Sequence, residues 1–354
     1  MPLSGREVTM AFGVLGTNSW GVPTSVTRRV YFESDAGLSS SAAYVDDQSF
    51  GQTFMGPADV GDFAPPQATL AGQAYYDHSD YILEAMAMGS PNAVTVVSSQ
   101  AASSLVAYSH IIDLAPNTNG RAITIATDKV NVVEELTSAK VAGFGFGIGQ
   151  GGVLSKRVSV LGGKSTIAST VNTRSAVAAS AVAPALANRI FRKQGVFRMN
   201  TQAAGALGVG DTLEVEEVTF EFTRPLAPAA VYGSDYTIEP LDDGFPSATL
   251  NVRFPRANTV SVNSFYAAHA AGTPFKASLT CTGGYINSTT QRSFAVEFPH
   301  LEPVQVPEHT AQGAGQLKSG MQFVAKQASA APTGFAHTRP FRLTRVTTQS
   351  LVAF

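Results

Sequence analysis

Charged residues are scarce in this chain of 354 residues: only 14% are Asp, Glu, Lys or Arg. A typical soluble domain has about 25%. Either much of the surface is covered by other copies of the chain, which we favour, or the chain is simply a neutral protein rich in Ala and Gly. The formal net charge of −2 argues against a basic field that would gather nucleic acid.

Cysteine and long apolar runs are also scarce. The single cysteine, Cys281, cannot form a disulfide within the chain, which fits a reducing compartment. No run of about 18 apolar residues is present, so we expect no helix that spans a membrane. The N-terminal sequence is too polar for a signal peptide.

One segment of the sequence occurs twice, about half a chain apart. The triplet Ala-Thr-Leu stands at 68–70 and again at 248–250, so the copies are 248 − 68 = 180 positions apart. In both copies an expected strand and a short helix lead to a Gly-x-Pro ending, at 89–91 and at 272–274. Gly favours the left-handed position after a helix, and a nearby Pro prevents continuation. The repeat predicts two copies of one domain.

Alternating apolar and polar residues predict a β-rich chain with one short helix in each half. We divide it into an N-terminal arm (1–25), a first module (26–165), a connector (166–205) and a second module (206–354). The first-half strands are expected at 26–32, 68–76, 110–114, 121–126, 140–147 and 153–161, with a helix at 80–88. The second-half strands are expected at 213–222, 276–282, 293–298, 317–327 and 341–347.

No motif of an enzyme or a cofactor site stands out. Residues 147–152 match G-x-G-x-x-G, but the next residues alternate like a strand, whereas a dinucleotide site requires a helix there. The six histidines show no zinc-like spacing, and the pairs at 46–47 and 242–243 are more typical of turn-capping Asp. The basic cluster at 189–198 could touch nucleic acid or a neighbour, although a solvated face is favoured. We therefore expect no catalytic, cofactor or metal residues.

A further set of features concerns the order of turns and aromatic residues. An arm with Trp20 in Gly-Thr-Asn-Ser-Trp-Gly-Val-Pro (16–23) leads to a strand and a long loop with Val-Asp-Asp at 45–47. Tyr-Tyr at 75–76, Met-Gly-Ser-Pro at 88–91 and Lys-Val-Ala-Gly-Phe at 140–144 follow. In this order and in its turn residues the chain resembles the tail tube proteins of tailed bacteriophages, particularly the larger ones of long non-contractile tails. The likeness covers most of residues 10–165, and the internal repeat extends it to the second half.

The resemblance implies a mainly β fold: two tandem β-sandwich modules whose sheets join into a barrel, each with a short flanking α-helix. It implies trimeric rings with approximate sixfold symmetry that stack into a tube through which double-stranded DNA passes. The implied partners are further copies of the chain, tail terminator and tail-tip or baseplate proteins, and a tape measure protein. The implied location is the virion tail, assembled in the host cytoplasm, with no membrane.

The long loop and the arm are the expected stacking elements. Their aromatic residues Trp20, Phe50, Phe54 and Phe63 are therefore candidates for the self-assembly interface. Two alternatives remain: another virion component, such as a terminator, head-decoration or fibre protein, and a carbohydrate-binding β-sandwich or hydrolase. The latter is disfavoured because the chain has one tryptophan and no evident catalytic acid pair.

Overall fold

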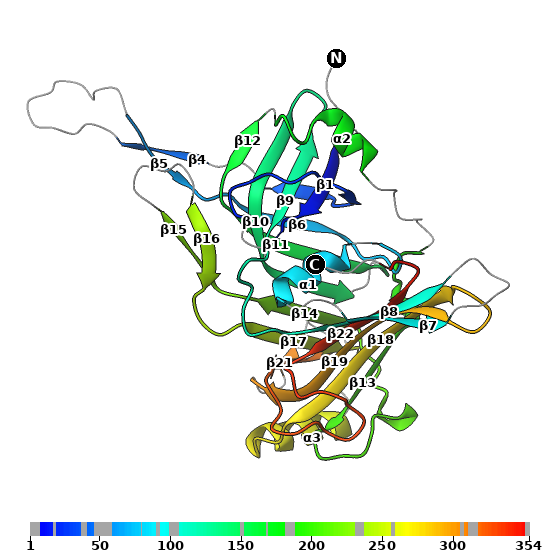
Figure 1. Cartoon of the computed structure of the whole chain (residues 1–354). Coiled ribbons are helices and arrows are strands. Elements are labelled where there is room, and N and C mark those ends of the chain that lie inside the picture. Colours follow the sequence, from blue (N-terminus) through cyan, green and yellow to red (C-terminus); the bar gives the residue numbers. More distant parts are fainter. Residues whose placement is uncertain are drawn as a thin grey trace, which may run out of the picture.

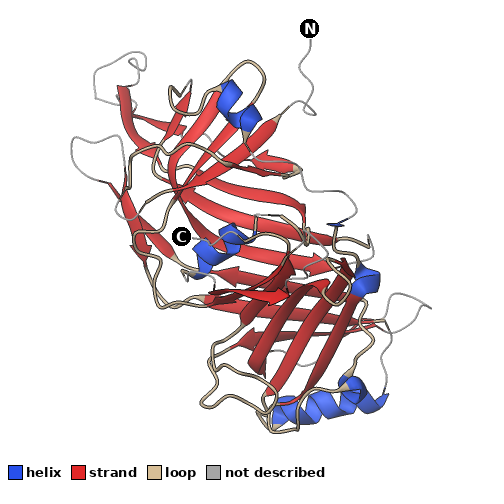
Figure 2. Cartoon of the chain, turned by 45° about the vertical axis from the view of Figure 1, so that its right-hand side comes forward, coloured by secondary structure: helices blue, strands red, loops and turns tan. Residues whose placement is uncertain are grey.

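The computed structural model of the chain is mainly β, as the sequence predicts. It describes residues 8–350 except 17–18, 37–40, 46–58, 79, 90–92, 99–105, 149–151, 168, 181–187, 231–236, 256–258, 305–307 and 311–317. Strands account for 53% and helices for 11% of the residues. Within the described part, eighteen strands form one curved, barrel-like network, and every pairing given below is antiparallel (Figure 2).

Most described elements are strands, with α-helices at three points in the order. The first half holds β1 (Thr9–Val14), β2 (Arg28–Val30), β3 (Ser34–Ala36), β4 (Ser41–Val45), β5 (Asp59–Ala64), β6 (Gln67–Gln73), α1 (Tyr81–Met88), β7 (Ala93–Ser98), β8 (Ala107–Asp113), β9 (Ile123–Asp128), β10 (Val133–Ile148) and β11 (Leu154–Gly162). Then come β12 (Ser165–Ile167), α2 (Arg174–Ala179), β13 (Gly195–Thr201), β14 (Glu217–Thr223), β15 (Leu226–Ala230), β16 (Thr237–Asp242), β17 (Ser247–Phe254), α3 (Thr259–Ala270), β18 (Phe275–Tyr285), β19 (Gln291–Pro303), β20 (Glu308–Thr310), β21 (Lys318–Ala325) and β22 (Arg342–Thr347). Two short 3₁₀ turns flank β13, at Arg192–Gln194 and Val209–Asp211.

A central sheet runs through both halves of the chain. Its strand order is β3-β6-β11-β10-β14-β17-β21-β20. The first four strands come from residues before 165 and the last four from residues after 206. The pairing of β10 with β14 is therefore a seam at which the two halves become one sheet (Figure 1).

Two outer sheets branch from this central sheet. The first has the order β2-β1-β9-β10, and β12 lies on the other side of β10. The second has the order β13-β18-β19-β22-β8-β7, so the β7–β8 hairpin of the first half extends a sheet of the second. A bulge between Leu136 and Ala139 marks the point where β10 leaves the outer sheet for the central one.

Two long hairpins project from one end of the central sheet. The β4–β5 hairpin stands between β3 and β6 in the sequence, and the β15–β16 hairpin stands between β14 and β17. Both reach out on the left of Figure 1.

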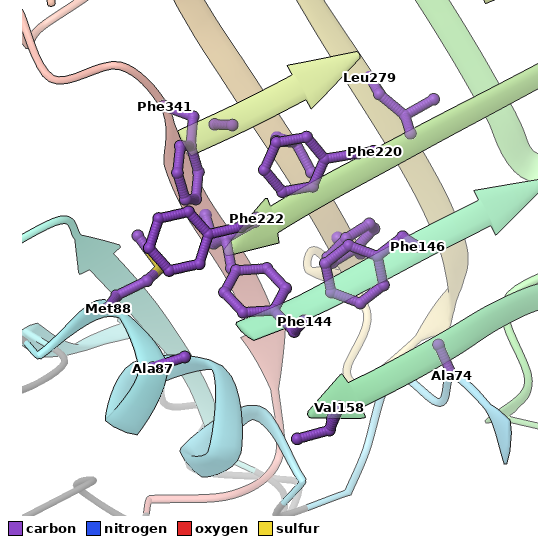
Figure 3. Close-up of a cluster of buried hydrophobic side chains, with 14 of the residues drawn as sticks. Ala74, Ala87, Met88, Phe144, Phe146, Val158, Phe220, Phe222, Leu279 and Phe341 are labelled. Carbon is purple, nitrogen blue, oxygen red and sulfur yellow. The ribbon is translucent and has the colours of Figure 1, made fainter. Parts of the chain in front are cut away.

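The core follows from the alternation of each strand. In β14, Val218, Phe220 and Phe222 are buried, while their neighbours in sequence are exposed or half-buried. Phe144 and Phe146 of β10 point to the same side, and Phe341 joins them (Figure 3). Ring centroids lie 5.4 Å apart for Phe144 and Phe222, and 4.9 Å apart for Phe220 and Phe341. The seam is thus backed by a cluster of aromatic rings, a contact geometry that adds to their area burial.

The helices differ from the sequence expectation in number and setting. α1 begins one residue after Asp80 and ends at Gly89, whose φ of 71° is the left-handed conformation predicted for it. All eight α1 residues are buried, because the helix lies inside the fold near the seam (Figure 1). The expectation of one helix per half missed α2, which lies in the proposed connector, where Thr173 caps its N-terminus.

Several strands also differ from their expected bounds. The single strand expected at 26–32 is instead β2 followed by β3, because the chain bends between a pairing with β1 and a pairing with β6. The proposed connector contains β12 and β13, each paired with a strand of one half. The Gly-rich stretch at 147–152 joins the hairpin strands β10 and β11, as predicted, and no helix follows it.

We predict that Phe144→Ala destabilises the fold by about 3–5 kcal/mol, because it removes a ring from a packed aromatic cluster and leaves a cavity. Urea unfolding monitored by circular dichroism measures the change. Val209→Ala is the matched control: Val209 is 82% exposed, so its truncation should change stability by less than about 0.5 kcal/mol. Equal effects of the two substitutions would contradict the role given to the cluster.

Candidate functional surface: the polar sheet face and the seam

One face of the central sheet packs on the core, and its opposite face is polar. Residues paired directly across strands share a face, so the register defines this polar face. Its members on the inner strands are Gln67, Thr69, Ala71, Gln73, Gly143, Gly145, Gly147, Ser155, Arg157, Ser159, Glu217, Thr219, Glu221, Thr223, Ser247, Thr249, Asn251, Arg253, Gly320, Gln322 and Val324. Hydroxyl, amide and glycine residues dominate, so the face is hydrophilic with few charges.

The charges on the polar face cancel. Arg157 Nη1 lies 3.8 Å from Glu221 Oε1, and both side chains are more than half exposed. Arg253 Nη2 lies 3.3 Å from Glu217 Oε2, and its Nε lies 3.4 Å from the nearby Glu216. Exposed ion pairs contribute little to stability, so their main effect is to leave the face without a net field.

Glycines form a strip along the seam. Gly145 is paired with Arg157 on one side and with Glu221 on the other, so this ion pair spans a strand that has no side chain there. A Cβ on Gly143 would stand 2.4 Å from the carbonyl oxygen of Phe222, and a Cβ on Gly147 would stand 3.0 Å from Ser155 Oγ. The bare strand leaves a shallow depression of about 290 Å³ on the polar face.

On the core side of the seam, α1 is clamped by an arginine from the second half. Arg224 donates from Nε to the carbonyl oxygen of Ala87 at 3.1 Å and from Nη2 to that of Met88 at 3.3 Å. Its Nη1 lies 3.3 Å from Asp242 Oδ2. The last carbonyls of a helix lack partners within the helix and carry partial negative charge. A buried cation from the second half therefore caps a helix of the first.

A buried ionic cluster holds the other end of α1. Lys156 Nζ lies 2.8 Å from Glu84 Oε1 and 3.0 Å from Asp80 Oδ2, and Arg345 Nη2 lies 2.6 Å from Glu84 Oε1. Lys156, Glu84 and Arg345 each have at most 1% of the side chain exposed. Burial by itself raises the pKa of Asp80, yet Lys156, with His78 and Arg345, holds that pKa well below its usual range. Because Arg345 belongs to the second half, this cluster also joins the halves.

The β15–β16 hairpin is fastened to the first half. Trp20 Nε1 donates to the carbonyl oxygen of Thr237 at 2.8 Å. Lys140 Nζ donates to the carbonyl oxygen of Pro240 at 2.6 Å and lies 2.8 Å from Glu239 Oε1, which also accepts from the Gly120 amide at 2.7 Å. These contacts fix the direction in which the hairpin leaves the sheet.

Of the four aromatic residues expected at the assembly interface, only Trp20 has a side chain within the described structure. Trp20 makes the contact with β16 described above and packs on Gly163. Phe63 lies in β5, opposite Ala42, and its side chain is outside the described part. Phe50 and Phe54 fall in a stretch outside the described residues. Their role in assembly stays a prediction.

Sequence reasoning missed the residues that define the seam. The run Gly-Phe-Gly-Phe-Gly at 143–147 was a usable signal, because strict alternation of Gly with Phe gives a strand one bare and one apolar face. Arg224 and Arg345 gave no such signal, since nothing in their neighbourhoods in sequence indicates burial against α1.

The described residues contain no group of three or more His, Cys, Asp or Glu side chains placed to hold a metal ion. His300 and Glu302, which the sequence brings close, lie 3.2 Å apart, and Lys326 shares the carboxylate. Of the helices in the described ranges, none has the length and apolarity needed to cross a membrane. Comparison of the chain with protein-family models and with curated proteins found no match.

We predict that Gly143→Ala destabilises the fold by about 1–3 kcal/mol, because its Cβ would meet backbone across the seam at 2.4 Å. Gly210→Ala is the matched control, since a Cβ there meets nothing within 4 Å. Thermal unfolding of both variants tests this, and a Gly143→Ala protein as stable as the control would show that the seam is looser than described.

Because the pKa of Asp80 is lowered in the folded protein, its carboxylate makes the free energy of unfolding depend on pH in acid. A carboxylate whose folded pKa is below its unfolded value of about 3.9 contributes stability above about pH 4 and loses it as the pH falls through the folded pKa. We therefore expect the free energy of unfolding of the wild type to fall more steeply than that of Asp80→Asn between about pH 5 and about pH 3, where the unfolded carboxyl takes up its proton. Urea unfolding at several pH values measures both slopes. Glu221→Gln, at an exposed pair, should keep the wild-type slope, and parallel curves for Asp80→Asn would refute the assignment.

Proposed function

We propose that the chain is a structural subunit of a bacteriophage tail tube. Three copies would form a ring with approximate sixfold symmetry, and stacked rings would form a tube through which double-stranded DNA passes. The support comes from the internal correspondence of the two halves, the central sheet that they share, and the character of its polar face.

The two halves pair their strands in the same order, which supports a duplicated module. β1-β9-β10-β11-β6-β3 in the first half corresponds to β13-β18-β19-β21-β17-β14 in the second. Ala139 pairs with both Ile123 and Gly162, and Leu301 pairs with both Phe275 and Ala325. α1 and α3 occupy equivalent places and end at glycines with φ of 71° and 61°.

The main difference between the halves is one insertion. From the Ala-Thr-Leu triplet to the next long strand, the first half spans 123 − 68 = 55 positions and the second 275 − 248 = 27. The extra residues hold the β7–β8 hairpin, which pairs with β22 of the second half. A duplicated module followed by one such insertion would account for the strand order that the two halves share.

The observation that carries the proposal is the central sheet with its two open edges. Within the described residues, β3 pairs with β6 alone and β20 with β21 alone. In the proposed correspondence, β20 matches part of β10, and β3 matches β14. Within the chain, β14 pairs with β10. The same pairing between chains, β20 of one copy with β3 of the next, would close the ring and remove both edges.

The size of such a ring suits a DNA conduit. Three chains would supply 8 × 3 = 24 strands. With strands about 4.8 Å apart and tilted by about 40°, the barrel would measure about 45–50 Å between opposite backbones. Side chains on both sides leave room for a duplex, whereas barrels of about eight strands are filled by their own side chains.

The polar face would line this conduit. Its two arginines and two glutamates cancel, and apart from Ala71 and Val324 its other residues are glycines or carry hydroxyl or amide groups. A basic lining would bind phosphates and hold the DNA, because each neutralised phosphate adds to affinity. A neutral, hydrated lining lets a polyanion pass. The tube's further partners would be terminator, tail-tip or baseplate and tape measure proteins, and its location the virion tail.

Negative-stain electron microscopy and analytical ultracentrifugation of the purified chain test this proposal. We expect trimeric rings and tubes with an open channel. Single rings that never stack at any concentration would favour a terminator, and a protein that stays monomeric at high concentration would overturn the proposal.

A proline at the open edge tests the ring seam directly. The Ala74 amide donates to the Leu154 carbonyl oxygen of β11, and amides alternate along a strand, so the odd-numbered residues of β6 face β3. Ala36 is paired with Thr69, so its amide faces β6, and the Asp35 amide faces the open edge.

We predict that Asp35→Pro keeps the monomer fold but abolishes rings, because it removes one donor of the joining ladder. Val97→Pro is the control: Val97 lies in a bulge of the edge strand β7, outside the central sheet. Normal rings from Asp35→Pro would exclude this edge from the seam.

A further inference from the structure

An apolar ring stands almost fully in solvent at the hairpin end of the central sheet. Phe245, in the turn between β16 and β17, is 97% exposed. The turn is held in place, since the Asp243 amide donates to the Pro225 carbonyl oxygen at 2.9 Å. A large exposed aromatic on an ordered turn is the kind of residue that anchors a protein interface.

An apolar pocket lies at the opposite end of the same strands. Its volume is about 400 Å³. Its apolar lining includes Ile148, Val196, Leu213, Val215, Pro255 and Leu279. A dry cavity of about 150 Å³ is enough for a benzene ring, so this pocket has room for a phenylalanine side chain and part of its turn.

The strands themselves set the relation between ring and pocket. Phe245 stands two residues before β17, and Pro255 of the pocket follows the last residue of β17. The eight residues of β17 span about 26 Å at roughly 3.3 Å per residue. A copy displaced along the strand direction would therefore bring its Phe245 to the pocket of the first. Complementary patches at different places on one molecule produce a repeating, head-to-tail contact.

Charges around the two sites are compatible with this contact. Exposed Asp243 precedes Phe245, and Arg192 lines the pocket with exposed Lys193 beside it. Of the pocket's carboxylates, Glu216 and Glu217 are both within 3.4 Å of Arg253; Glu214 lies at the exposed rim. Asp243 would thus approach the basic side of the opening.

We propose that Phe245 of one copy inserts into this pocket of a second copy of the chain in the next ring, and that this contact drives stacking. The inference rests on the tail-tube function proposed above. It assigns stacking to a residue of the second half, in addition to the long loop and the arm expected from the sequence.

Tube growth of Phe245→Ala tests the contact. Because loss of a central anchor costs about 2 kcal/mol or more, we expect the critical concentration for tubes, measured by sedimentation, to rise by at least about 30-fold while trimeric rings remain. Val209→Ala is the matched control, at an exposed apolar residue outside the pocket, and should grow tubes as wild type. Rings that stack equally well without the Phe245 ring would overturn this inference and leave the proposed function standing.

Oxidative cross-linking gives an independent readout. Phe245→Cys combined with Val196→Cys, at the pocket opening, should give a ladder of disulfide-linked oligomers on mild oxidation. Native Cys281 should not interfere, because it is buried and burial raises its pKa to about 12. Val209→Cys with Val196→Cys, and each single variant, should give no ladder. Absence of a ladder in tubes of the first pair would refute the contact, and a chain that forms no rings at all would refute the proposed function and the contact together.

Discussion

The antiparallel pairing of β10 with β14 is the constraint on which the rest of the structure depends. It joins strands from the two halves into one sheet, and its two faces impose opposite demands. On the core face, Phe144 and Phe222 pack ring against ring. On the polar face, the glycines of β10 let the backbone of β14 approach and let Arg157 reach Glu221 over Gly145. Larger residues at the glycines would force the strands apart.

The seam also explains how α1 is wholly buried although Glu84 lies in it and Asp80 directly before it. Lys156 from β11 pairs with both carboxylates, and Arg345 from the second half pairs with Glu84. Arg224, also from the second half, donates to the last carbonyl oxygens of the helix. Buried charges are costly without such partners. Removal of either half would leave part of this set uncompensated, so the two halves are coupled energetically as well as through the sheet. By contrast, Tyr266 on α3 is 36% exposed.

The proposed assembly would use different parts of one sheet in its two directions. Within the described residues, the central sheet ends in the strand edges of β3 and β20, and it carries Phe245 at one end and an apolar pocket at the other. We propose that edge pairing acts around a ring and the Phe245 contact along a stack. In that proposal the polar face lines the lumen, where neutrality would matter because phosphate binding would slow DNA. The low charge content of the sequence fits a protein covered on several sides.

The sequence by itself determined the β-rich character, most strands, the α1 boundaries and the two glycine-ended helices, because alternation and left-handed caps are local properties of the chain. It also indicated the repeat at 68–70 and 248–250. It could not place Arg224 or Arg345 at α1, divide the strand expected at 26–32, or identify Phe245 and its pocket. Those features depend on which distant strands pair, and pairing is decided by the joint packing of both faces of the sheet, which only the tertiary structure brings together.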